Sequence, residues 1–530
     1  MDHPRFATCL LVLAPLLAGA ASQPPAAAAR PPNVIVILAD DLGYGDVSAY
    51  GQGKIKTPAI DTLARDGVRM TDAYSAAATC TPSRYALMTG EYPWRKPGTG
   101  ILPGDAAMII SPARLTLPRI FKNAGYATGA VGKWHLGLGD GKDALDFNQR
   151  IAPGLNELGF DYAFNMAATG DRMPTVFMEN GRVLNLNPAD PITVSYEHQV
   201  GALPTGREHP ELLRMTADKG HDGTIVNGIG RIGFMSGGAT ALWQDQALGD
   251  TFSAKALQFI RANKDHPFFL YYAAHEPHVP RDPNPRFVGK SGVGARGDAV
   301  LQLDEAVGRL LATLREEGLE NNTLVLLSSD NGPVKNDGYN DQVLENEVKA
   351  GHHANGRMRG GKYLDYEGGV RMPFLARWPG HIPAGKVCSE IISLVDLPAL
   401  AAALTHQSFH ASDAPDSLDP LPALTRCAAT RESVLFGNPL DAKPHTASAI
   451  RVGEWKLLAN RADNMEKDLP IDYPRDNGSY PQLYNLRSDI SESSNVASDH
   501  ADIVKRMNAM LERASTDGFT RPGAQPEPLR

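Results

Sequence analysis

Asn33-Val-Ile-Val-Ile-Leu-Ala39, followed directly by Asp40-Asp41, is the stretch that points most clearly to the fold. The run is continuously apolar and rich in β-branched residues, which is typical of a strand buried on both faces of a parallel sheet. It ends abruptly in two carboxylates. In open α/β sheets, ligands bind at the edge formed by the carboxyl ends of the strands. This stretch therefore predicts both a parallel sheet and a polar site at its edge.

Three later segments repeat this arrangement of a buried strand followed by polar residues. They are 127–131 before Lys133 and His135, 268–273 before His275 and His278, and 323–327 before Asp330 and Asn331. Segments with helical spacing alternate with the strands, at 57–67, 116–125, 251–263 and 298–317. This alternation predicts an α/β fold with a mostly parallel sheet. Polar residues also begin ordinary loops, but four such strand ends together favour one shared site.

The remaining parts of the chain have a different texture. Residues 146–231 are rich in Gly, Pro and Asn and predict an insertion of loops and short strands over the sheet edge. Residues 406–425 read as a Ser/Asp/Pro-rich connector. Short strands are expected at 431–436, 449–452, 455–459 and 482–487, with a terminal helix at 501–513. The C-terminal part is therefore expected to be a smaller α+β domain with an antiparallel sheet.

The stretch Ala78-Thr-Cys-Thr-Pro-Ser-Arg84 presents a cysteine close to a predicted helix. Thr81 can cap this helix, Pro82 fits its first turn, and Gly90 can end it. Cys80 would then precede a helix N-terminus, where backbone N–H groups favour an anion, and Arg84 could reach back toward it. These residues alone allow either a nucleophile beside an anion site or a buried structural cysteine.

Cys80-x-Pro-Ser-Arg84, continued by x-x-Leu-Met-Thr-Gly90, resembles the signature of the type I sulfatases at every position. Gly125-Tyr-Ala-Thr-Gly-Ala-Val-Gly-Lys-Trp-His135 resembles the second signature of that family, and Gly361-Lys362 resembles its segment that brings a lysine to the sulfate. The resemblance spans about 32–379 and, more faintly, 483–492. It implies an alkaline-phosphatase-like α/β sandwich, with a large mostly parallel sheet between helices. It also implies a sulfuric ester hydrolase that releases inorganic sulfate from a sulfate monoester.

The resemblance also implies roles for individual residues. In the family, a maturation enzyme oxidises the cysteine to formylglycine, whose hydrated aldehyde is the nucleophile. The positions that match catalytic residues are Cys80, Arg84, Lys133, His135, His278 and Lys362. The positions that match the ligands of one divalent cation are Asp40, Asp41, Cys80, Asp330 and Asn331. Four of these ligands supply hard oxygen atoms, which suit Ca²⁺ and also Mg²⁺.

The loop region 165–196 matches no motif of the family, and the pocket that selects the substrate is expected there. His275 could line this pocket or only hydrogen-bond its own loop. Arg172, His198 and His221 lie in or near the predicted insertion and are further candidates, although each could be an ordinary polar loop residue. The sequence does not choose between an aryl sulfate and a sulfated saccharide as substrate.

Composition and the N-terminus bear on location and partners. The chain has 530 residues, of which 52 are basic and 60 acidic, so its net charge of −8 gives no general attraction for nucleic acid. Arg5, an apolar run at 7–17 and Ala18-Gly-Ala20 predict a signal peptide at 1–20 and an exported protein, periplasmic or secreted, without a stable membrane anchor. The expected divisions after it are a leader at 21–31, a catalytic domain at 32–405, the connector at 406–425 and a C-terminal subdomain at 426–530.

Three cysteines remain after cleavage of the predicted signal peptide. Export permits a disulfide between Cys388 and Cys427, which would leave Cys80 unpaired. A pairing of Cys80 with either partner stays open from the sequence alone. An unpaired thiol in an oxidising compartment is a liability unless it is converted, so the count fits the modification.

Two other functions stay open beside the sulfatase. One is a phosphonate monoester hydrolase or phosphatase on the same fold, because phosphonate monoester hydrolases can share the modified cysteine motif. Alkaline phosphatases proper use a Ser or Thr nucleophile and two zinc ions, and the chain offers neither that nucleophile nor the extra His/Asp ligand set. The other is a non-catalytic relative that binds sulfated glycans, which would have no need for the nucleophile.

Overall fold

An eleven-stranded sheet forms the centre of the computed structural model, which describes Met1 and residues 30–51, 53–437, 446–459 and 479–525. Its strands, in spatial order, are β14 (Lys386–Cys388), β2 (Val68–Tyr74), β13 (Arg371–Arg377), β12 (Thr323–Ser329), β1 (Asn33–Ala39), β11 (Phe268–Ala273), β3 (Ala127–Lys133), β4 (Tyr162–Met166), β5 (Met178–Glu179) and β6 (Arg182–Val183), with β15 (Ile392–Ser393) also paired to β2. The run from β12 to β4 is parallel, so these strands have their carboxyl ends at one edge. The predicted signal peptide at 1–20 and the leader at 21–31 fall largely in 2–29, outside the described residues.

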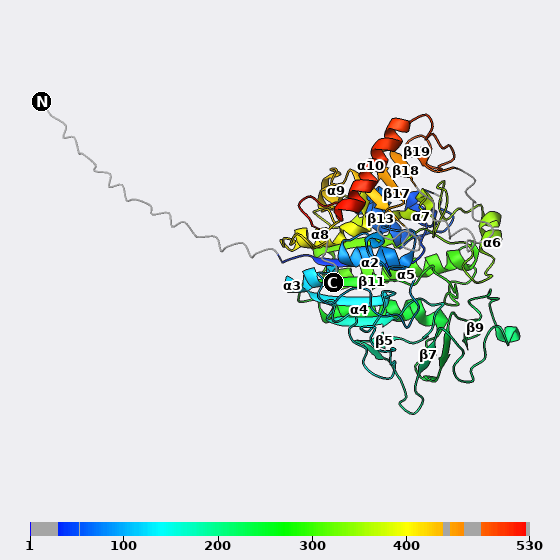
Figure 1. Ribbon diagram of the computed structural model, residues 1–530. Coiled ribbons are helices and arrows are strands. Elements are labelled where there is room, and N and C mark those ends of the chain that lie inside the picture. Colours follow the sequence, from blue (N-terminus) through cyan, green and yellow to red (C-terminus); the bar gives the residue numbers. More distant parts are fainter. Residues whose placement is uncertain (2–29, 52, 438–445, 460–478, 526–530) are drawn as a thin grey trace. The chain divides into compact units, whose positions relative to one another are not determined.

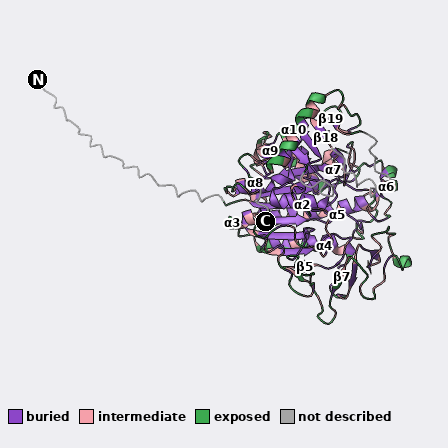
Figure 2. Ribbon diagram, in the orientation of Figure 1, coloured by how far each residue is buried: buried purple, intermediate pink, exposed green. Residues whose placement is uncertain are grey.

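Alternation along β1 explains why helices cover both faces of the sheet. All seven of its residues are buried. Side chains at positions 34, 36 and 38 enter one hydrophobic core, and those at 35, 37 and 39 enter the other. Figure 2 shows the result as buried strands lying inside a partly exposed shell of helices. The predicted α/β sandwich with a mostly parallel central sheet is therefore confirmed.

Two sets of helices build these cores. On one face lie α2 (Cys80–Thr89), α3 (Leu117–Asn123), α8 (Leu397–Leu404) and α9 (Leu421–Arg426). On the other face lie α1 (Pro58–Arg65), α4 (Leu248–Ala262) and α5 (Gly294–Glu316). The short helices α6 (Val343–Ala350) and α7 (Glu367–Val370) lie in the segment between β12 and β13.

Several predicted boundaries differ from the observed ones. The helix at Cys80 was expected to be capped by Thr81, but α2 begins at Cys80 itself and its N-cap is Thr79. The Thr81 hydroxyl instead donates to the carbonyl of His135, at 3.0 Å. Gly90, at φ 67°, ends the helix as predicted. The strands expected at 127–131 and 323–327 both continue two residues further, so Lys133 belongs to β3.

The predicted insertion consists of short strands joined by loops. After β4, β5 and β6 come β7 (Thr193–Ser195), β8 (Ile225–Val226), β9 (Ile229–Gly230) and β10 (Phe234–Ser236). Contrary to the prediction, β4 does not lie over the sheet edge but extends the sheet itself, parallel to β3. In Figure 1 the labelled strands β5, β7 and β9 lie at the opposite end of the molecule from β18, β19 and α10.

The C-terminal part forms the predicted small antiparallel sheet. It contains β16 (Ser433–Phe436), β17 (Ala449–Val452), β18 (Trp455–Leu458) and β19 (Gln482–Asn485). The helix α10 (Ala501–Asp517) packs Met507 and Leu511 into one hydrophobic cluster with Ile450 and Leu457 of this sheet. The expected connector at 406–425 is not wholly irregular, because α9 begins within it. Among the described residues, no helix is long and apolar enough to cross a membrane.

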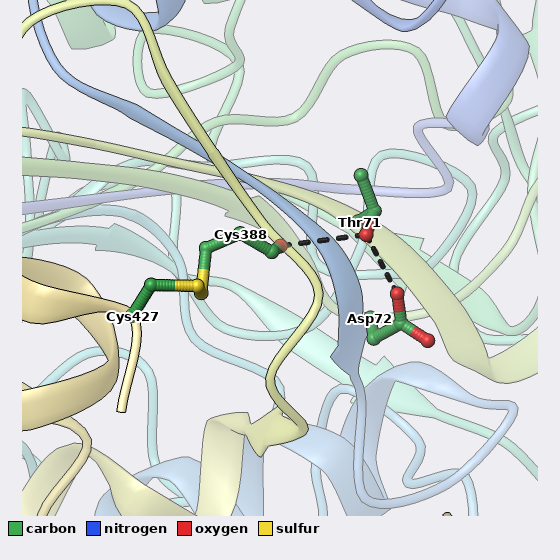
Figure 3. Close-up of a disulfide and its surroundings, with 4 residues drawn as sticks. All are labelled: Thr71, Asp72, Cys388 and Cys427. Carbon is green, nitrogen blue, oxygen red and sulfur yellow. Dashed lines mark hydrogen bonds between the residues drawn. A yellow bond between two sulfur atoms is a disulfide. The ribbon is translucent and has the colours of Figure 1, made fainter. Parts of the chain in front are cut away.

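Cys388 and Cys427 form a disulfide, and Cys80 is a free, buried thiol. The Cα atoms of the bridged residues lie 5.5 Å apart. Figure 3 shows the bridge beside β2, where the Thr71 hydroxyl donates to the Cys388 carbonyl at 3.4 Å and to the Asp72 carboxylate at 2.6 Å. Of the pairings that the sequence left open, Cys388 with Cys427 is therefore the one observed.

Candidate active site

Polar residues converge where four neighbouring parallel strands end. Their spatial order is β12, β1, β11 and β3, so the segments that follow them are adjacent. The residues that these strand ends bring together are Asp40, Asp41, Lys133, His135, His275, His278, Asp330 and Asn331. All of them are buried. The residues at these four strand ends therefore lie together in one buried cluster.

Cys80 faces this cluster from the first turn of α2. Its Sγ lies 3.3 Å from Nδ1 of His135. Since Nε2 of His135 lies 2.9 Å from the carbonyl of Leu102, that nitrogen carries the ring proton and Nδ1 is left as an acceptor toward Cys80. Burial, and then Lys133, hold the pKa of His135 well below its usual value. Burial also raises the pKa of the Cys80 thiol, so both groups are neutral near pH 7.

Arg84 lies one turn further along α2 and points into the same cluster. Its Nε and Nη2 both lie 2.8 Å from Oδ2 of Asp330, and its Nη1 donates to the carbonyl of Lys133 at 3.1 Å. The guanidinium interacts with the Cys80 side chain electrostatically, but no hydrogen bond joins them. Burial alone would raise the pKa of Asp330, but Arg84 and Lys133 outweigh burial and lower it.

Three carboxylates form an oxygen-rich centre beside Cys80. Oxygen atoms of Asp40, Asp41 and Asp330 all lie within 4.8 Å of one another. The Asn331 side chain joins them by donating to Oδ1 of Asp41 at 2.6 Å. Oδ1 of Asp40 and Oδ1 of Asn331 are buried without a hydrogen-bond partner, which is unusual unless another group contacts them. This donor set therefore fits a hard divalent cation.

Two buried lysines lie against these carboxylates. Nζ of Lys133 is 2.7 Å from Oδ2 of Asp40, and Nζ of Lys362 is 3.0 Å from Oδ2 of Asp41. Burial raises the pKa of Asp40 well above its ordinary value, even with Lys133 beside it. For Lys362, burial alone would lower the pKa, but Asp337 and Asp41 raise it well above its ordinary value. Lys362 is therefore positively charged near pH 7.

The two histidines after β11 differ in their contacts. Nδ1 of His278 donates to the carbonyl of Val279 at 2.6 Å, and its Nε2 lies 3.2 Å from Nζ of Lys362. Lys362 is the donor in this second contact because an ammonium has no acceptor. His275 has both ring nitrogens buried without a hydrogen-bond partner. Burial, then Lys133, lower the pKa of His275 to about 4, so this ring is neutral.

Arg172 also belongs to the surroundings of the site. Its Nη1 lies 2.9 Å from both carboxylate oxygens of Asp171 and interacts electrostatically with Cys80. Nε2 of His221 lies 3.4 Å from Oδ2 of the same Asp171, and its Nδ1 lies 3.0 Å from Oδ1 of Asp218. Burial alone would lower the pKa of His221, but Asp171 and Asp218 raise it to about 9.

Not every candidate lies here, and some members of the site were not predicted. His198 is exposed and lies 3.5 Å from the hydroxyl of Ser195, within its own loop. Asp337 was missed, although its carboxylate accepts from Nζ of Lys362 at 2.9 Å and from the hydroxyl of Tyr363 at 3.0 Å. In the sequence, Asp337 is only part of an Asp-Gly turn, and nothing distinguishes it from other loop aspartates.

Strained backbone occurs at three positions of this site. Asp41, His135 and Tyr363 have positive φ angles of 63°, 59° and 77°. Such angles are unusual for residues other than glycine, and for a bulky residue such as tyrosine they are true outliers. Outliers of this kind cluster at functional sites because the surrounding structure holds them in place.

Comparison with known proteins assigns this arrangement to a family. The protein-family model described as Sulfatase matches residues 32–407. An N-acetylgalactosamine-6-O-sulfatase of Bacteroides thetaiotaomicron is 47% identical over 483 residues, which cover 91% of this chain and 93% of that protein. Arylsulfatase A of Homo sapiens is 33% identical over 480 residues, which cover 87% of this chain and 82% of that protein.

A solved structure leads to the same assignment. It comes from work on the metabolism of multiple glycosaminoglycans by Bacteroides thetaiotaomicron, and it matches with a TM-score of 0.86 and 46% identity. The match covers 92% of this chain and 100% of that one. The family model spans well over half of the chain, and the relatives align along most of their length. The chain therefore belongs to the sulfatase family, as its type I signature predicts, and is an enzyme that hydrolyses sulfate esters.

Proposed function

We propose that this sulfatase acts on a sulfated glycan and releases sulfate from the 6-O position of an N-acetylhexosamine. The 47% identity to an N-acetylgalactosamine-6-O-sulfatase over 91% of the chain supports this substrate. The observation that supports the chemistry best is the buried cluster in which Cys80, three carboxylates and two lysines meet. A sulfate monoester is anionic, and the two lysines supply the positive charge that would bind it. The reaction consumes one water and yields an alcohol and inorganic sulfate.

Cys80 is the proposed nucleophilic position, after its oxidation to formylglycine by a maturation enzyme. The aldehyde hydrate would supply one hydroxyl that attacks sulfur and a second whose deprotonation releases sulfate and restores the aldehyde. His135 is suited to take that second proton, because its unprotonated Nδ1 lies 3.3 Å from the position-80 side chain. Arg84, held by Asp330, would keep this side chain oriented.

Asp40, Asp41, Asp330 and Asn331, with the side chain at position 80, would hold one divalent cation, which we propose to be Ca²⁺. Mg²⁺ also accepts oxygen ligands but demands stricter octahedral geometry. When bound, the cation would neutralise charge on the sulfate and favour the ionised nucleophile. The unpartnered buried oxygens of Asp40 and Asn331 support this assignment.

The two lysines and His278 would act on the sulfate and the leaving group. The ammonium of Lys133 contacts Asp40, and that of Lys362 contacts Asp41. Both would therefore lie close to a sulfate group bound beside these two carboxylates. Fixed cations that meet developing negative charge are a main source of rate enhancement in such transfers. His278 is neutral and its Nε2 accepts from Lys362, so the proton given to the departing sugar oxygen would come from Lys362 by way of Nε2 of His278.

Substrate choice would depend on the segments around Arg172 and His275. Arg172 has one guanidinium nitrogen engaged by Asp171, and it lies in the loop region that the family signatures do not cover. His275 is neutral and has no hydrogen-bond partner among the described residues, so it remains available to bind a hydroxyl or sulfate oxygen.

We further propose that the protein is exported to the periplasm or beyond, where it would meet glycans. The N-terminal pattern at 1–20 supports this location. A catalytic domain at 32–405, a connector at 406–425 and a C-terminal subdomain at 426–530 remain our proposed divisions of the mature chain.

Turnover of a defined panel tests the proposal, measured as released sulfate for the sulfate esters and as released phenol for the phosphonate ester. The panel contains N-acetylgalactosamine 6-sulfate, its 4-sulfate isomer, an aryl sulfate and an aryl phosphonate monoester, assayed with protein matured in its own host. We expect the 6-sulfate to have the highest kcat/KM among the esters of saccharides, and Cys80→Ala to abolish turnover. A higher kcat/KM on the phosphonate ester would favour the phosphonate hydrolase, and binding of the 6-sulfate without turnover by verified matured protein would favour the binding protein.

A further inference from the structure

The turn that carries Asp40 and Asp41 is stabilised by a cluster of three buried polar side chains. This group, called here the Asp46 network, consists of Asp46, Arg296 and His352, whose side chains are all fully buried. Oδ2 of Asp46 accepts from the backbone N–H of Gly43 at 2.8 Å and from Nη2 of Arg296. Oδ1 accepts from Nε2 of His352, also at 2.8 Å. The Asp46 network therefore stabilises the turn after β1 internally, through Gly43, and connects this turn to α5 and to the segment that contains His352.

Arg296 also reaches the backbone of both segments that supply the oxygen-rich centre. Its Nη2 donates to the carbonyl of Asp41 at 2.8 Å, and its Nη1 donates to the carbonyl of Val334 at 3.3 Å. Asp41 belongs to the segment after β1, and Val334 follows Asn331 by three residues in the segment after β12. One guanidinium thus joins two segments that lie almost 300 positions apart in the sequence.

Arg296 belongs to a long helix that packs into the hydrophobic core. It is the third residue of α5, a helix of 23 residues whose apolar side chains pack into the core under the sheet. The Asp41 carbonyl that Arg296 holds belongs to a residue with a φ angle of 63°, a conformation that needs support from its surroundings. Releasing this carbonyl would let Asp41 relax and turn its carboxylate away from Asp40 and Asp330.

An arginine is suited to this task and a lysine is not. The planar guanidinium can bond a carboxylate and two carbonyls at once, in directions fixed by its shape. A lysine ammonium at position 296 could still neutralise Asp46, but as a compact point charge it could not also hold both carbonyls. The interaction therefore depends on the shape of the side chain as well as on its charge.

We infer that Arg296 is a positioning residue for the divalent cation, because it holds the Asp41 and Val334 segments at the spacing that the oxygen ligands require. This inference rests on the proposed cation site. Arg296 touches neither sulfate nor cation, and its effect on cation affinity is exerted through the ligands that it positions. Residues that orient metal ligands from behind typically change metal affinity about 10- to 100-fold when they are replaced.

Arg431 offers a matched control in the same chain. It is also buried, and it bonds one carboxylate, that of Asp396, and two backbone carbonyls, those of Asp416 and Ser433. None of these partners belongs to the segments that carry the oxygen ligands. Arg431→Lys therefore makes the same chemical change in a similar environment, away from the cation.

The test is calorimetric titration of Ca²⁺ into chelator-treated, dialysed full-length protein, with thermal unfolding measured in chelator and in excess Ca²⁺. We expect Arg296→Lys to raise the Kd for Ca²⁺ about 10- to 100-fold, and Arg431→Lys to leave it at the wild-type value. The gain in Tm on adding Ca²⁺ should shrink only in Arg296→Lys. Because that variant could also lower the general stability, the Tm in chelator separates the two effects.

A second variant covers the case in which Arg296→Lys does not fold. The double substitution Arg296→Met with Asp46→Asn removes both charges of the pair. Glu347, whose Oε1 lies 3.9 Å from Nε of Arg296, keeps Lys335 as an ion-pair partner. The double variant should also raise the Kd for Ca²⁺. If either folded variant bound Ca²⁺ with the wild-type Kd, the inference would be wrong. If the wild-type protein bound no Ca²⁺, the cation proposal itself would fail, and this inference with it.

Discussion

Cys80 and His135 form a neutral pair in a site otherwise filled with charges. Burial raises the pKa of the thiol and lowers that of the imidazole, so neither is charged near pH 7. A thiol that stays protonated is a poor nucleophile. The unmodified side chain is therefore not activated by its surroundings, which agrees with the proposal that position 80 acts only after conversion.

His278 is expected to matter in proportion to the basicity of the leaving group. His278→Gln should lower kcat/KM by about 10²- to 10⁴-fold on a sugar sulfate, because the alkoxide that departs must be protonated. On an aryl sulfate with an acidic phenol the loss should be much smaller. The check is a comparison of both substrates with wild-type and variant protein. Equal losses on the two substrates would contradict a role in proton delivery.

The sequence could identify most of the site's residues but not their contacts. Asp40, Asp41, Asp330 and Asn331 were recognisable because they end buried strands and match a family pattern. Asp337 was not, since its importance lies in contacts with Lys362 and Tyr363, 25 and 26 positions away. Contacts of this kind depend on how loops fold back, which no local pattern of residues records.

At the scale of elements, long buried strands were predictable and short ones were not. β1, β11 and β17 have the predicted bounds, because continuous or alternating apolar residues mark them. β8 and β9 contain two residues each, too few for any periodicity to appear. The start of α2 was misjudged: the helix begins at Cys80 after the N-cap Thr79, and the Thr81 hydroxyl donates to the distant His135 carbonyl.

Glu492 joins α7 to the C-terminal sheet and should make stability depend on pH. Its carboxylate accepts from the backbone N–H of Glu367 at 2.6 Å and lies 3.3 Å from Nζ of Lys456. Burial raises the pKa of Glu492 from an ordinary 4.5 to about 7, with Glu367 adding to the rise and Lys456 opposing it. Between these values the folded protein binds more protons than the unfolded chain. The free energy of unfolding should therefore fall as pH rises from 4.5 to 7.

Glu492→Gln should remove this fall, because glutamine keeps an oxygen for the Glu367 N–H and does not titrate. The expected difference across the window is at most on the order of 3 kcal/mol. Urea unfolding of both proteins at several pH values measures it. Parallel pH profiles for wild type and variant would show that Glu492 is not the titrating group. Glu367 is not expected to contribute here, because its neighbours lower its pKa to about 2.

At the scale of the whole molecule, the sandwich was predictable and the connections across it were not. Helices alternating with buried strands specify an α/β fold, but the order of strands follows from packing between distant segments. The same holds for β4, which was expected over the sheet edge and instead extends the sheet. The disulfide was one of several pairings that the cysteine count allowed.

The Cys388–Cys427 bridge links β14 to the end of α9 across a separation of 39 residues. Replacing both cysteines by serine should lower the free energy of unfolding by about 2–4 kcal/mol, because the unfolded chain regains the entropy of the closed loop. Turnover should persist at 25 °C, since neither cysteine contacts the site residues. Denaturant unfolding and a sulfate assay on the same preparation check both statements. Loss of turnover in a fully folded variant would contradict this separation.

The most direct test of the catalytic account is the mass of the tryptic peptide from Met70 to Arg84, taken from protein matured in its own host. We predict that position 80 carries an aldehyde, so that the peptide is lighter than the thiol form by the difference between –CH₂SH and –CHO. This result would support position 80 as the nucleophile, poised by His135, Arg84 and the cation ligands. A peptide that carries only the unmodified thiol, from a preparation that releases sulfate, would contradict the account.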